Sequence, residues 1–136
     1  MKVYAVIDTN VIVSAILSKK HDSATVRVLG SLMENKFIPV FNEEIISEYK
    51  DVLYRKKFRF PTQKISKVLN KINENGLQVE RTKSNETFPD PSDAVFYEVA
   101  LSKEGSFVVT GNLKHFPKSP IVVTPSEILE IINSKE

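Results

Sequence analysis

The sequence predicts an α/β fold in which a mainly parallel sheet of four to five strands is covered by helices on both faces. Short runs of β-branched and aromatic residues alternate with longer stretches whose apolar residues recur every three or four positions. The first run, residues 3–7, has no polar alternation, which is typical of a strand buried on both faces of a parallel sheet. Strands that alternate with helices imply right-handed crossovers and therefore helices on both sides of the sheet.

The first third of the chain predicts a strand, two helices and a second strand. Residues 11–17 form an apolar stretch that indicates a helix after the first strand. Asp22 is the expected cap of the next helix, whose apolar face consists of Val26, Leu29, Leu32 and Met33. Residues 37–41 predict a strand. Because Pro39 has no backbone N–H to donate, we expect this strand to be irregular or to lie at an edge of the sheet.

The middle third carries two further helical patterns. Asn42 is the expected cap of the first, with Glu43 and Glu44 in its first turn. The second starts at Thr62 and stops at Gly76. Their inward stripes are Ile45, Tyr49, Val52 and Leu53 in the first, and Ile65, Val68, Leu69 and Ile72 in the second. Residues 77–80 then predict a short strand and residues 81–87 a polar loop.

The last third has the clearest punctuation. Asp90, Pro91, Ser92 and Asp93 open a helix whose inward side chains are Val95, Phe96, Val99 and Ala100. Residues 107–109 predict a buried strand that ends at Thr110, Gly111 and Asn112, and residues 121–123 predict another. Thr124 and Glu127 form a capping box around Pro125 and start the final helix.

Composition narrows the class of protein. With 136 residues, 41% of them hydrophobic and 26% charged, the chain supports one core, so we expect a single domain over residues 1–136. The absence of cysteine excludes disulfides, zinc–thiolate sites and thiol nucleophiles. Only Lys2 precedes the first apolar run, which suits neither a signal peptide nor a membrane span, so a cytoplasmic protein without a membrane partner is expected. The net charge is only +2, so attraction to nucleic acid must come from local clusters.

Polar side chains gather where such a sheet would place a ligand. Asp8 and Asn112 each follow a buried strand, and Asp90 and Asp93 open the helix that precedes the second of these strands. Glu48 lies at the edge of an apolar helix face, where an acid is costly to bury unless something neutralises it.

Acids brought together in this way need a proton or a cation between them. Two carboxylates about 4 Å apart repel by roughly 4 kcal/mol at an effective dielectric constant near 20. Oxygen ligands suit Mg²⁺ or Mn²⁺, which retain open positions for a phosphate oxygen and an attacking water. The pattern therefore indicates metal-assisted phosphodiester hydrolysis.

Four motifs, in this order and spacing, resemble the PIN domain: Ile7-Asp8-Thr9-Asn10, the segment from Glu44 to Tyr49, Asp90-Pro91-Ser92-Asp93 and Val109-Thr110-Gly111-Asn112. The resemblance covers essentially the whole chain, including residues 124–129, and within that family it extends to the small single-domain toxins (VapC-like) of toxin–antitoxin systems. It implies a three-layer α/β/α sandwich and a ribonuclease that depends on Mg²⁺ or Mn²⁺. Asp8, Glu48 and Asp93 match the principal acids of the family. Asn112 stands where many members have a fourth aspartate, so it could ligate a cation but brings no charge.

Each of these residues also has a purely structural interpretation. Asp8 could cap the following helix, and Glu48 could be a helix-edge acid paired with a lysine. Asp90 and Asp93 could form a cap with an acidic first turn, and Asn112 could be a turn residue. Thr9 and Asn10 are expected to orient the acids or to cap the helix, and Asp90 and Thr110 to support the site.

Basic residues suggest where RNA would bind. Residues 54–60 interleave cations with aromatics, so Arg55 and Lys57 could contact phosphates while the rings stack on bases. The alternative is a solvated turn whose Phe58 and Phe60 fill the core. Lys114 and His115 follow Asn112 and are better placed to meet a phosphate near the metal.

The leading hypothesis is a metal-dependent endonuclease of single-stranded RNA. Asp8 and Asp93 would hold the ion, Glu48 would complete the site and help deprotonate the water, and Asn112 would support it. The second hypothesis is a non-catalytic module that binds RNA or a protein. A phosphoacceptor domain fits poorly, because an aspartate at a third strand end and a lysine after the last strand are absent.

The resemblance also suggests partners. A cognate antitoxin would silence the protein, and a homodimer is expected to use the apolar faces around Leu29 or Leu69, which could equally belong to the core.

Overall fold

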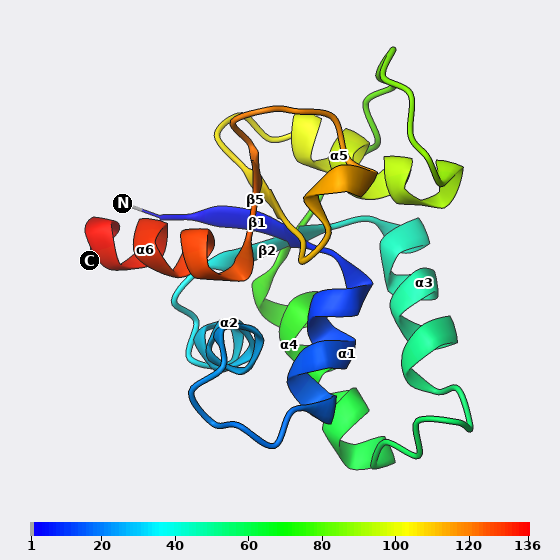
Figure 1. Cartoon of the computed structure of the whole chain (residues 1–136), viewed down its shortest axis with the longest axis vertical. Helices are drawn as coiled ribbons and strands as arrows, with labels where there is room; N and C mark the ends of the chain where they lie inside the picture. Colours follow the sequence, from blue (N-terminus) through cyan, green and yellow to red (C-terminus); the bar gives the residue numbers. More distant parts are fainter. Residues whose placement is uncertain (1) are drawn as a thin grey trace.

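The computed structural model describes residues 2–136 and contains one five-stranded sheet, all of whose strands are parallel. The strand order is β3-β2-β1-β4-β5, so the first strand lies in the middle (Figure 1). The strands are β1 (Tyr4–Ile7), β2 (Ile38–Phe41), β3 (Leu77–Gln78), β4 (Phe107–Val109) and β5 (Val122–Val123). β1 pairs Ala5 with Pro39 on one side and with Phe107 on the other. The predicted parallel sheet is confirmed, with the third and fifth strands shorter than expected.

Helices cover both faces of this sheet. They are α1 (Thr9–Leu17), α2 (Ala24–Met33), α3 (Glu43–Leu53), α4 (Thr62–Asn75), α5 (Ala94–Leu101) and α6 (Pro125–Lys135), with single 3₁₀ turns η1 (Pro91–Asp93) and η2 (Leu113–His115). α5 packs on β1, β2 and β4, whereas α4 packs on β2 and contacts α2, which in turn contacts α1 and α6. Figure 1 places α5 on the opposite side of the sheet from α1, α2 and α4. This is the predicted three-layer α/β/α sandwich.

The core joins the central strands to the inner helix faces. Ala5, Val6 and Ile7 are at most 3% exposed, as expected for a strand covered on both faces. Ile65, Leu69 and Ile72 of α4 are buried, so that apolar face belongs to the core. On α2, Val28 and Leu32 are buried, and Leu29 and Met33 are half-buried against the same cluster. None of the helices within residues 2–136 is both long enough and apolar enough to cross a membrane.

Of the two positions predicted for Pro39, the edge of the sheet is wrong, because β2 lies between β1 and β3. The amide of Ile38 donates to the carbonyl of Val3 (2.8 Å), so the next backbone nitrogen along the strand faces β3. β3 pairs with β2 only from Val40 onward. Because β3 starts only opposite Val40, it has no carbonyl that would need a backbone N–H from residue 39. β2 therefore accommodates Pro39 although it lies inside the sheet.

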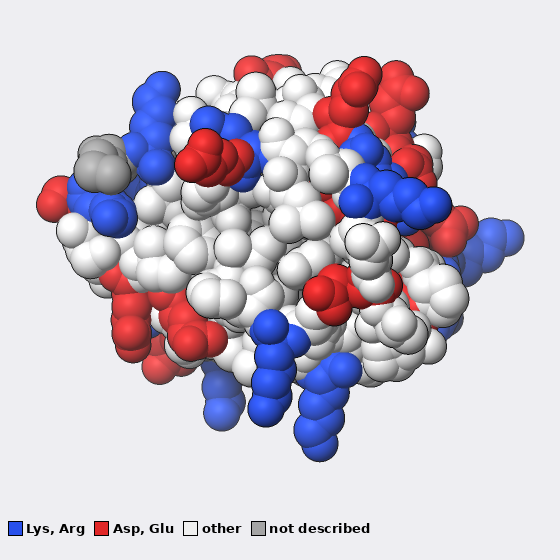
Figure 2. Space-filling model, turned by 90° about the horizontal axis from the view of Figure 1, so that it is seen from above, with Lys and Arg blue, Asp and Glu red and all other residues white. Residues whose placement is uncertain are grey.

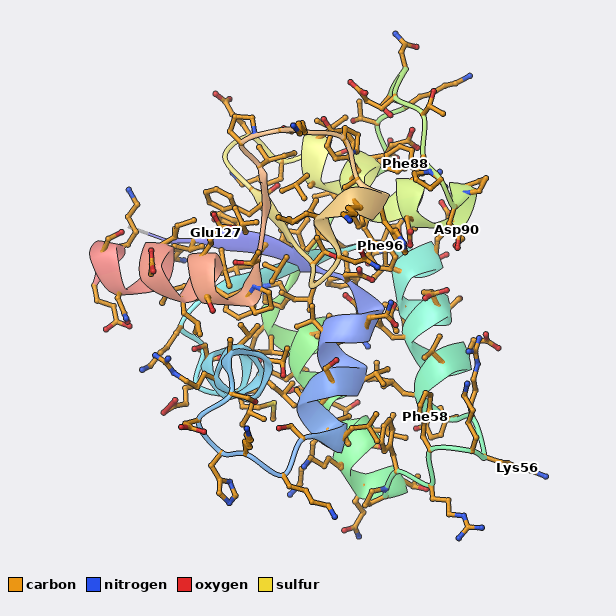
Figure 3. The ribbon with its side chains drawn as sticks, in the orientation of Figure 1. Lys56, Phe58, Phe88, Asp90, Phe96 and Glu127 are labelled. Carbon is orange, nitrogen blue, oxygen red and sulfur yellow. The ribbon has the colours of Figure 1, made fainter. Side chains whose placement is uncertain are left out.

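The helix caps agree with the sequence except at the second helix. Ser23, and not Asp22, caps α2 by accepting a hydrogen bond from the amide of Val26. Asn42 caps α3 through the amide of Ile45 (2.9 Å), and Thr124 forms the predicted capping box with Glu127, labelled in Figure 3. Asp22 and Ser23 are both good cap residues, and the one that meets the first helical turn with an extended backbone takes the role.

Candidate active site

The predicted acids surround the point where the strand order reverses. The chain runs from β1 outward through β2 to β3 and then crosses back to β4 and β5 on the other side of β1. The carboxyl ends of β1 and β4 therefore lie at the switch point of the sheet, where open α/β folds bind their ligands. The amide of Asp8 donates to the carbonyl of Val109 (2.9 Å), so the two strand ends are joined directly. Asp8 and Thr110, each one residue past its strand, therefore lie side by side.

The Asp8 carboxylate faces β4 and does not cap α1. Asp8 occupies the residue before α1, but its side chain makes no cap hydrogen bond. Its Oδ2 instead accepts a hydrogen bond from the hydroxyl of Thr110 (2.8 Å), and the Thr110 Oγ1 accepts one from the backbone N–H of Asn112 (3.0 Å). Asp8 is only 5% exposed. Burial raises the pKa of its carboxyl. The Thr110 hydrogen bond and the backbone N–H of Asn10 oppose this rise, and the charge of Glu48 adds to it.

Glu48 approaches the same switch point of the sheet from α3. Its Oε2 accepts from the hydroxyl of Thr9 (2.9 Å), and within residues 2–136 no lysine or arginine pairs with it. The lysine-paired interpretation of Glu48 is therefore not what the structure contains. The neighbouring Tyr49 is buried, and its hydroxyl donates to the carbonyl of Ile7 (2.5 Å). This hydrogen bond fixes α3 against the residue that precedes Asp8.

Asp90 and Asp93 have different surroundings. Asp90 is exposed, and its Oδ1 accepts from the amide (3.0 Å) and hydroxyl (2.8 Å) of Ser92, which lowers its pKa and makes it a local cap. Asp93 is half-buried, with 18% of its side chain exposed. Burial raises the pKa of Asp93 to about 6, together with the charges of Asp8, Asp90 and Glu48 and against that of His115. The acids of three separate elements therefore influence one another.

The turn after β4 supplies amide and imidazole groups. His115 Nδ1 lies 3.6 Å from Asp93 Oδ2, and His115 Nε2 lies 3.1 Å from the side-chain Nδ2 of Asn112. The backbone of Asn112 (φ −134°) is not in the left-handed region, so a left-handed turn is not its role. Lys114 lies on the same turn and is exposed, as is Asn10 at the start of α1.

The donor set suits a hard cation in kind, although it does not form a closed cage. Over the part of the chain that the structure describes, no group of three or more acidic, histidine or cysteine side chains is arranged to hold a metal ion. Asp8, Glu48 and Asp93 nevertheless offer oxygen ligands. The charge of Glu48 raises the pKa of Asp8, and the charges of Asp8 and Glu48 raise the pKa of Asp93. A divalent cation relieves such repulsion, so the chemistry of these residues fits Mg²⁺ or Mn²⁺.

A buried ion pair, which the sequence did not reveal, holds the loop that leads to this site. Glu98 of α5 is buried, and its carboxylate accepts from Arg81 Nε (2.5 Å) and from the amide (2.8 Å) and hydroxyl (3.1 Å) of Ser84. Arg81 also donates to Glu44 of α3 (2.8 Å). Arg81 thus joins the helix that carries Glu48 to the helix that starts after Asp93. The only signal in the sequence was an acid within the apolar run of α5.

Phe88 anchors the end of the same loop. Its ring packs edge-on against Tyr97 (5.8 Å between centroids) and Phe116 (6.1 Å). In Figure 3, Phe88 lies close to the turn that carries Asp90. An aromatic residue at the end of a polar stretch was the sequence feature that could have indicated this anchor.

Arg55 and Lys57 lie away from the acids. They belong to the turn after the last residue of α3, and Figure 3 shows its Lys56 and Phe58 far from Asp90. Phe58 stacks on Phe60 at 4.9 Å, and both pack against the core. Arg55 pairs with Asp51, and Lys57 lies over the Phe58 ring. The interpretation as a solvated turn with core aromatics describes this segment.

Comparison with known proteins identifies the family. A protein-family model described as PIN domain matches residues 4–114, which include Asp8, Glu48, Asp93 and Asn112. No curated protein matches the chain. PIN domains are generally nucleases and typically use divalent metal ions. Since the match spans most of the sequence and the fold agrees with it, this chain belongs to the PIN domain family.

Proposed function

We propose that the protein is a metal-dependent endoribonuclease that hydrolyses phosphodiester bonds of single-stranded RNA. The observation that carries the proposal is the buried Asp8, which forms no salt bridge with any residue between 2 and 136 and lies among the charges of Glu48 and Asp93. A buried carboxylate of this kind needs a counter-ion. Membership of a family of nucleases supports the same conclusion.

Asp8 and Asp93 would hold Mg²⁺ or Mn²⁺, with the amide oxygen of Asn112 as a neutral supporting ligand. The ion, when bound, supplies a positive charge to neutralise a phosphate oxygen and lowers the pKa of a water molecule. The hydroxyl of Thr110 orients Asp8 and favours its ionised form, against the effect of burial. His115, whose Nδ1 lies 3.6 Å from Asp93 Oδ2, would help to position Asp93.

Glu48 would accept the proton of the attacking water. It is half-buried, and its hydrogen bond from Thr9 occupies one oxygen and leaves the other for the water. Thr9 acts through Glu48 and is a positioning residue. Asp90, which is turned toward Ser92, would support the start of η1 and not the ion.

Cleavage of a labelled single-stranded RNA tests this function. The wild-type protein should cleave in Mn²⁺ or Mg²⁺ and stop when EDTA is added. Asp8→Asn and Asp93→Asn should abolish cleavage, and Glu48→Gln should reduce it by about 10²–10⁴-fold, the usual contribution of a general base. Asp22→Asn, at an exposed position beyond the C-terminal end of α1, is the matched control and should cleave normally. Cleavage that persists in EDTA or in Asp8→Asn would exclude the proposal.

A second candidate is a non-catalytic module that binds RNA or a protein. It is favoured by Asn112, which leaves the site with one acid fewer than many PIN domains. This candidate predicts RNA binding that survives Asp8→Asn, with no cleavage in any divalent metal. Metal-dependent turnover of RNA would rule it out.

We further propose that the protein acts in the cytoplasm as the toxin of a toxin–antitoxin pair, that it can form a homodimer, and that a small antitoxin controls it. Induced expression in bacteria should then arrest growth, and the Asp8→Asn variant should not. Growth arrest by both proteins would contradict a catalytic toxin. The product of the neighbouring open reading frame should suppress the arrest, and sedimentation velocity reports the dimer.

A further inference from the structure

A groove of about 470 Å³ lies beside the candidate active site, between η2 and the edge strand β5. Its volume falls within the range of about 300–1,000 Å³ that is usual for ligand pockets. The residues that line it are Leu113, Lys114, Phe116, Pro117, Lys118, Ser119 and Val122. Most of them follow residue 114, where the match to the family ends.

One turn connects the groove to the acids. In a 3₁₀ helix, consecutive side chains project about 120° apart. His115 of η2 is directed toward Asp93 and Asn112, whereas Leu113 and Lys114 of the same turn line the groove. The single turn η2 therefore separates Asp93 from the groove.

The lining combines positive charge with exposed apolar surface. Lys114 and Lys118 are exposed, and no acidic residue lines the groove. Leu113 is 47% exposed, which is unusual for a large hydrophobic residue in this structure. Phe116 is buried and forms the floor, where its ring packs against Phe88. Elsewhere basic and acidic side chains are interleaved, as Figure 2 shows for much of the face that carries α5.

These properties match a polyanion that carries flat apolar groups. Lysines pair with phosphates, and an exposed leucine beside a proline offers a surface for an unpaired base. The acids at Asp8, Glu48 and Asp93 repel phosphate, so a substrate needs nearby cations to remain in place. Arg55 and Lys57 cannot supply them, because they lie at the far end of α3.

We propose that this groove binds the segment of single-stranded RNA adjacent to the bond that is cleaved. Lys114 and Lys118 contact successive phosphates, and Leu113 and Pro117 contact a base. The assignment rests on the proposed nuclease function for its orientation toward the acids, but RNA binding by the groove can be measured without cleavage.

The test is the salt dependence of RNA binding in EDTA. A fluorescein-labelled twelve-residue oligouridylate is titrated with protein at several salt concentrations, and binding is read by fluorescence anisotropy. For single strands the slope of log K against log salt is about −0.7 per phosphate contact. Lys114→Ala with Lys118→Ala should therefore reduce the slope by about 1.4 and weaken binding about 25-fold at 0.1 M salt.

Two variants act as controls. Lys64→Ala with Lys67→Ala removes the same charge from another groove, between α2 and α4, which is lined by Leu29, Met33, Pro61, Gln63 and Val68. It should leave the slope and the affinity unchanged. Leu113→Ser should weaken binding without changing the slope, because it removes apolar contact and no charge. Circular dichroism establishes that all variants are folded.

The outcomes separate the groove from the nuclease proposal. An equal loss of slope in both lysine pairs, or no loss in either, overturns the groove as the RNA site, even if the wild-type protein cleaves RNA in Mn²⁺. Loss of slope confined to Lys114 and Lys118 supports the groove, even if no cleavage is found. The assignment is also overturned if replacing Lys114 and Lys118 leaves RNA binding unchanged but abolishes the binding of a protein partner.

Discussion

Replacing Arg81 by methionine tests the buried ion pair that holds the loop before Asp93. Arg81→Met removes the hydrogen bond to Glu98 and the bond to Glu44, but it keeps much of the aliphatic stem. Only 9% of the Glu98 side chain is exposed, against 57% for Glu44. Nearly all of the cost should therefore come from Glu98, which keeps only its two hydrogen bonds from Ser84.

The expected magnitude follows from these exposures. A hydrogen bond to a charged group contributes about 1.5–3 kcal/mol. Because 34% of the Arg81 side chain is exposed, solvent screens part of this interaction. We expect Arg81→Met to lower the free energy of unfolding by about 1.5–2 kcal/mol. Glu44→Gln, the matched control on the exposed branch, should cost about 0.5 kcal/mol or less.

The assay is urea denaturation in EDTA, arranged as a double-mutant cycle of Arg81→Met and Glu98→Gln. The coupling energy should be about 1–2 kcal/mol. Burial opposes ionisation of Glu98, but the hydrogen bonds from Ser84 and Arg81 outweigh it and lower its pKa below the ordinary 4.5. The stabilisation is therefore complete above about pH 4.5 and is lost as the pH falls through the folded pKa. The gap between wild type and Arg81→Met should shrink accordingly.

Additive single variants, with a coupling energy below about 0.3 kcal/mol, would refute this reasoning. So would a gap that widens toward pH 3, because protonation of Glu98 removes the charge that Arg81 neutralises. In either case the loop would be held by Phe88 and the remaining hydrogen bonds, and not by the ion pair.

Three further predictions concern the acids and their supports. In EDTA at pH 7, Asp93→Asn should raise the free energy of unfolding by about 1 kcal/mol. A pKa of about 6 against the ordinary 3.8 sets an upper limit of about 3 kcal/mol, which partial exposure reduces. Because the pKa of Asp93 is raised in the folded state, the stability of the wild-type protein falls as the pH rises from 3.8 to about 6. The difference in free energy of unfolding between wild type and Asp93→Asn should therefore vanish below about pH 4, as measured by urea titration. A difference that persists at that pH would contradict the prediction. Thr110→Val should lower the free energy of unfolding by about 1.5–3 kcal/mol at pH 7 and weaken Mn²⁺ binding measured by calorimetry. Thr110→Ser keeps the hydroxyl and should change neither property. Equal losses in the two variants would argue against a stabilising hydrogen bond to Asp8. Tyr49→Phe should lower the free energy of unfolding by about 1–3 kcal/mol, because it leaves the buried Ile7 carbonyl without its donor. Tyr54→Phe, at a position 46% exposed, should have no measurable effect on thermal unfolding. Matching losses in the two variants would refute the prediction.

Much of the fold could be predicted because local patterns agree with the tertiary arrangement. The run at residues 3–7 has no polar member, and it forms the central strand, where both faces are covered. Asn42 and Thr124 cap their helices as expected, since a cap depends only on the next few residues. The edge position expected for Pro39 was wrong, because it was inferred only from the missing backbone N–H of the proline. β3 starts only opposite Val40, so that N–H is not needed.

The candidate site was predictable only in part. Asp8 and Thr110 follow strands that the sequence reveals, and parallel strands bring their carboxyl ends to one edge. The sequence left open whether Asp8 caps α1 and whether Glu48 pairs with a lysine. These choices depend on side chains that approach from residues 102 and 39 positions away, Thr110 for Asp8 and Thr9 for Glu48.

The sequence by itself determined the class of fold, the order of its elements and the polar residues that end the strands, since these follow from hydrophobic periodicity. Only the tertiary structure decided that Asp90 is a local cap while Asp93 joins the acids, that Arg81 links α3 to α5 through Glu98, and that Lys114 and Lys118 line one groove. The physical reason is that burial and long-range contact set the pKa and the partner of a charged side chain. Neither property is encoded in its neighbours along the chain.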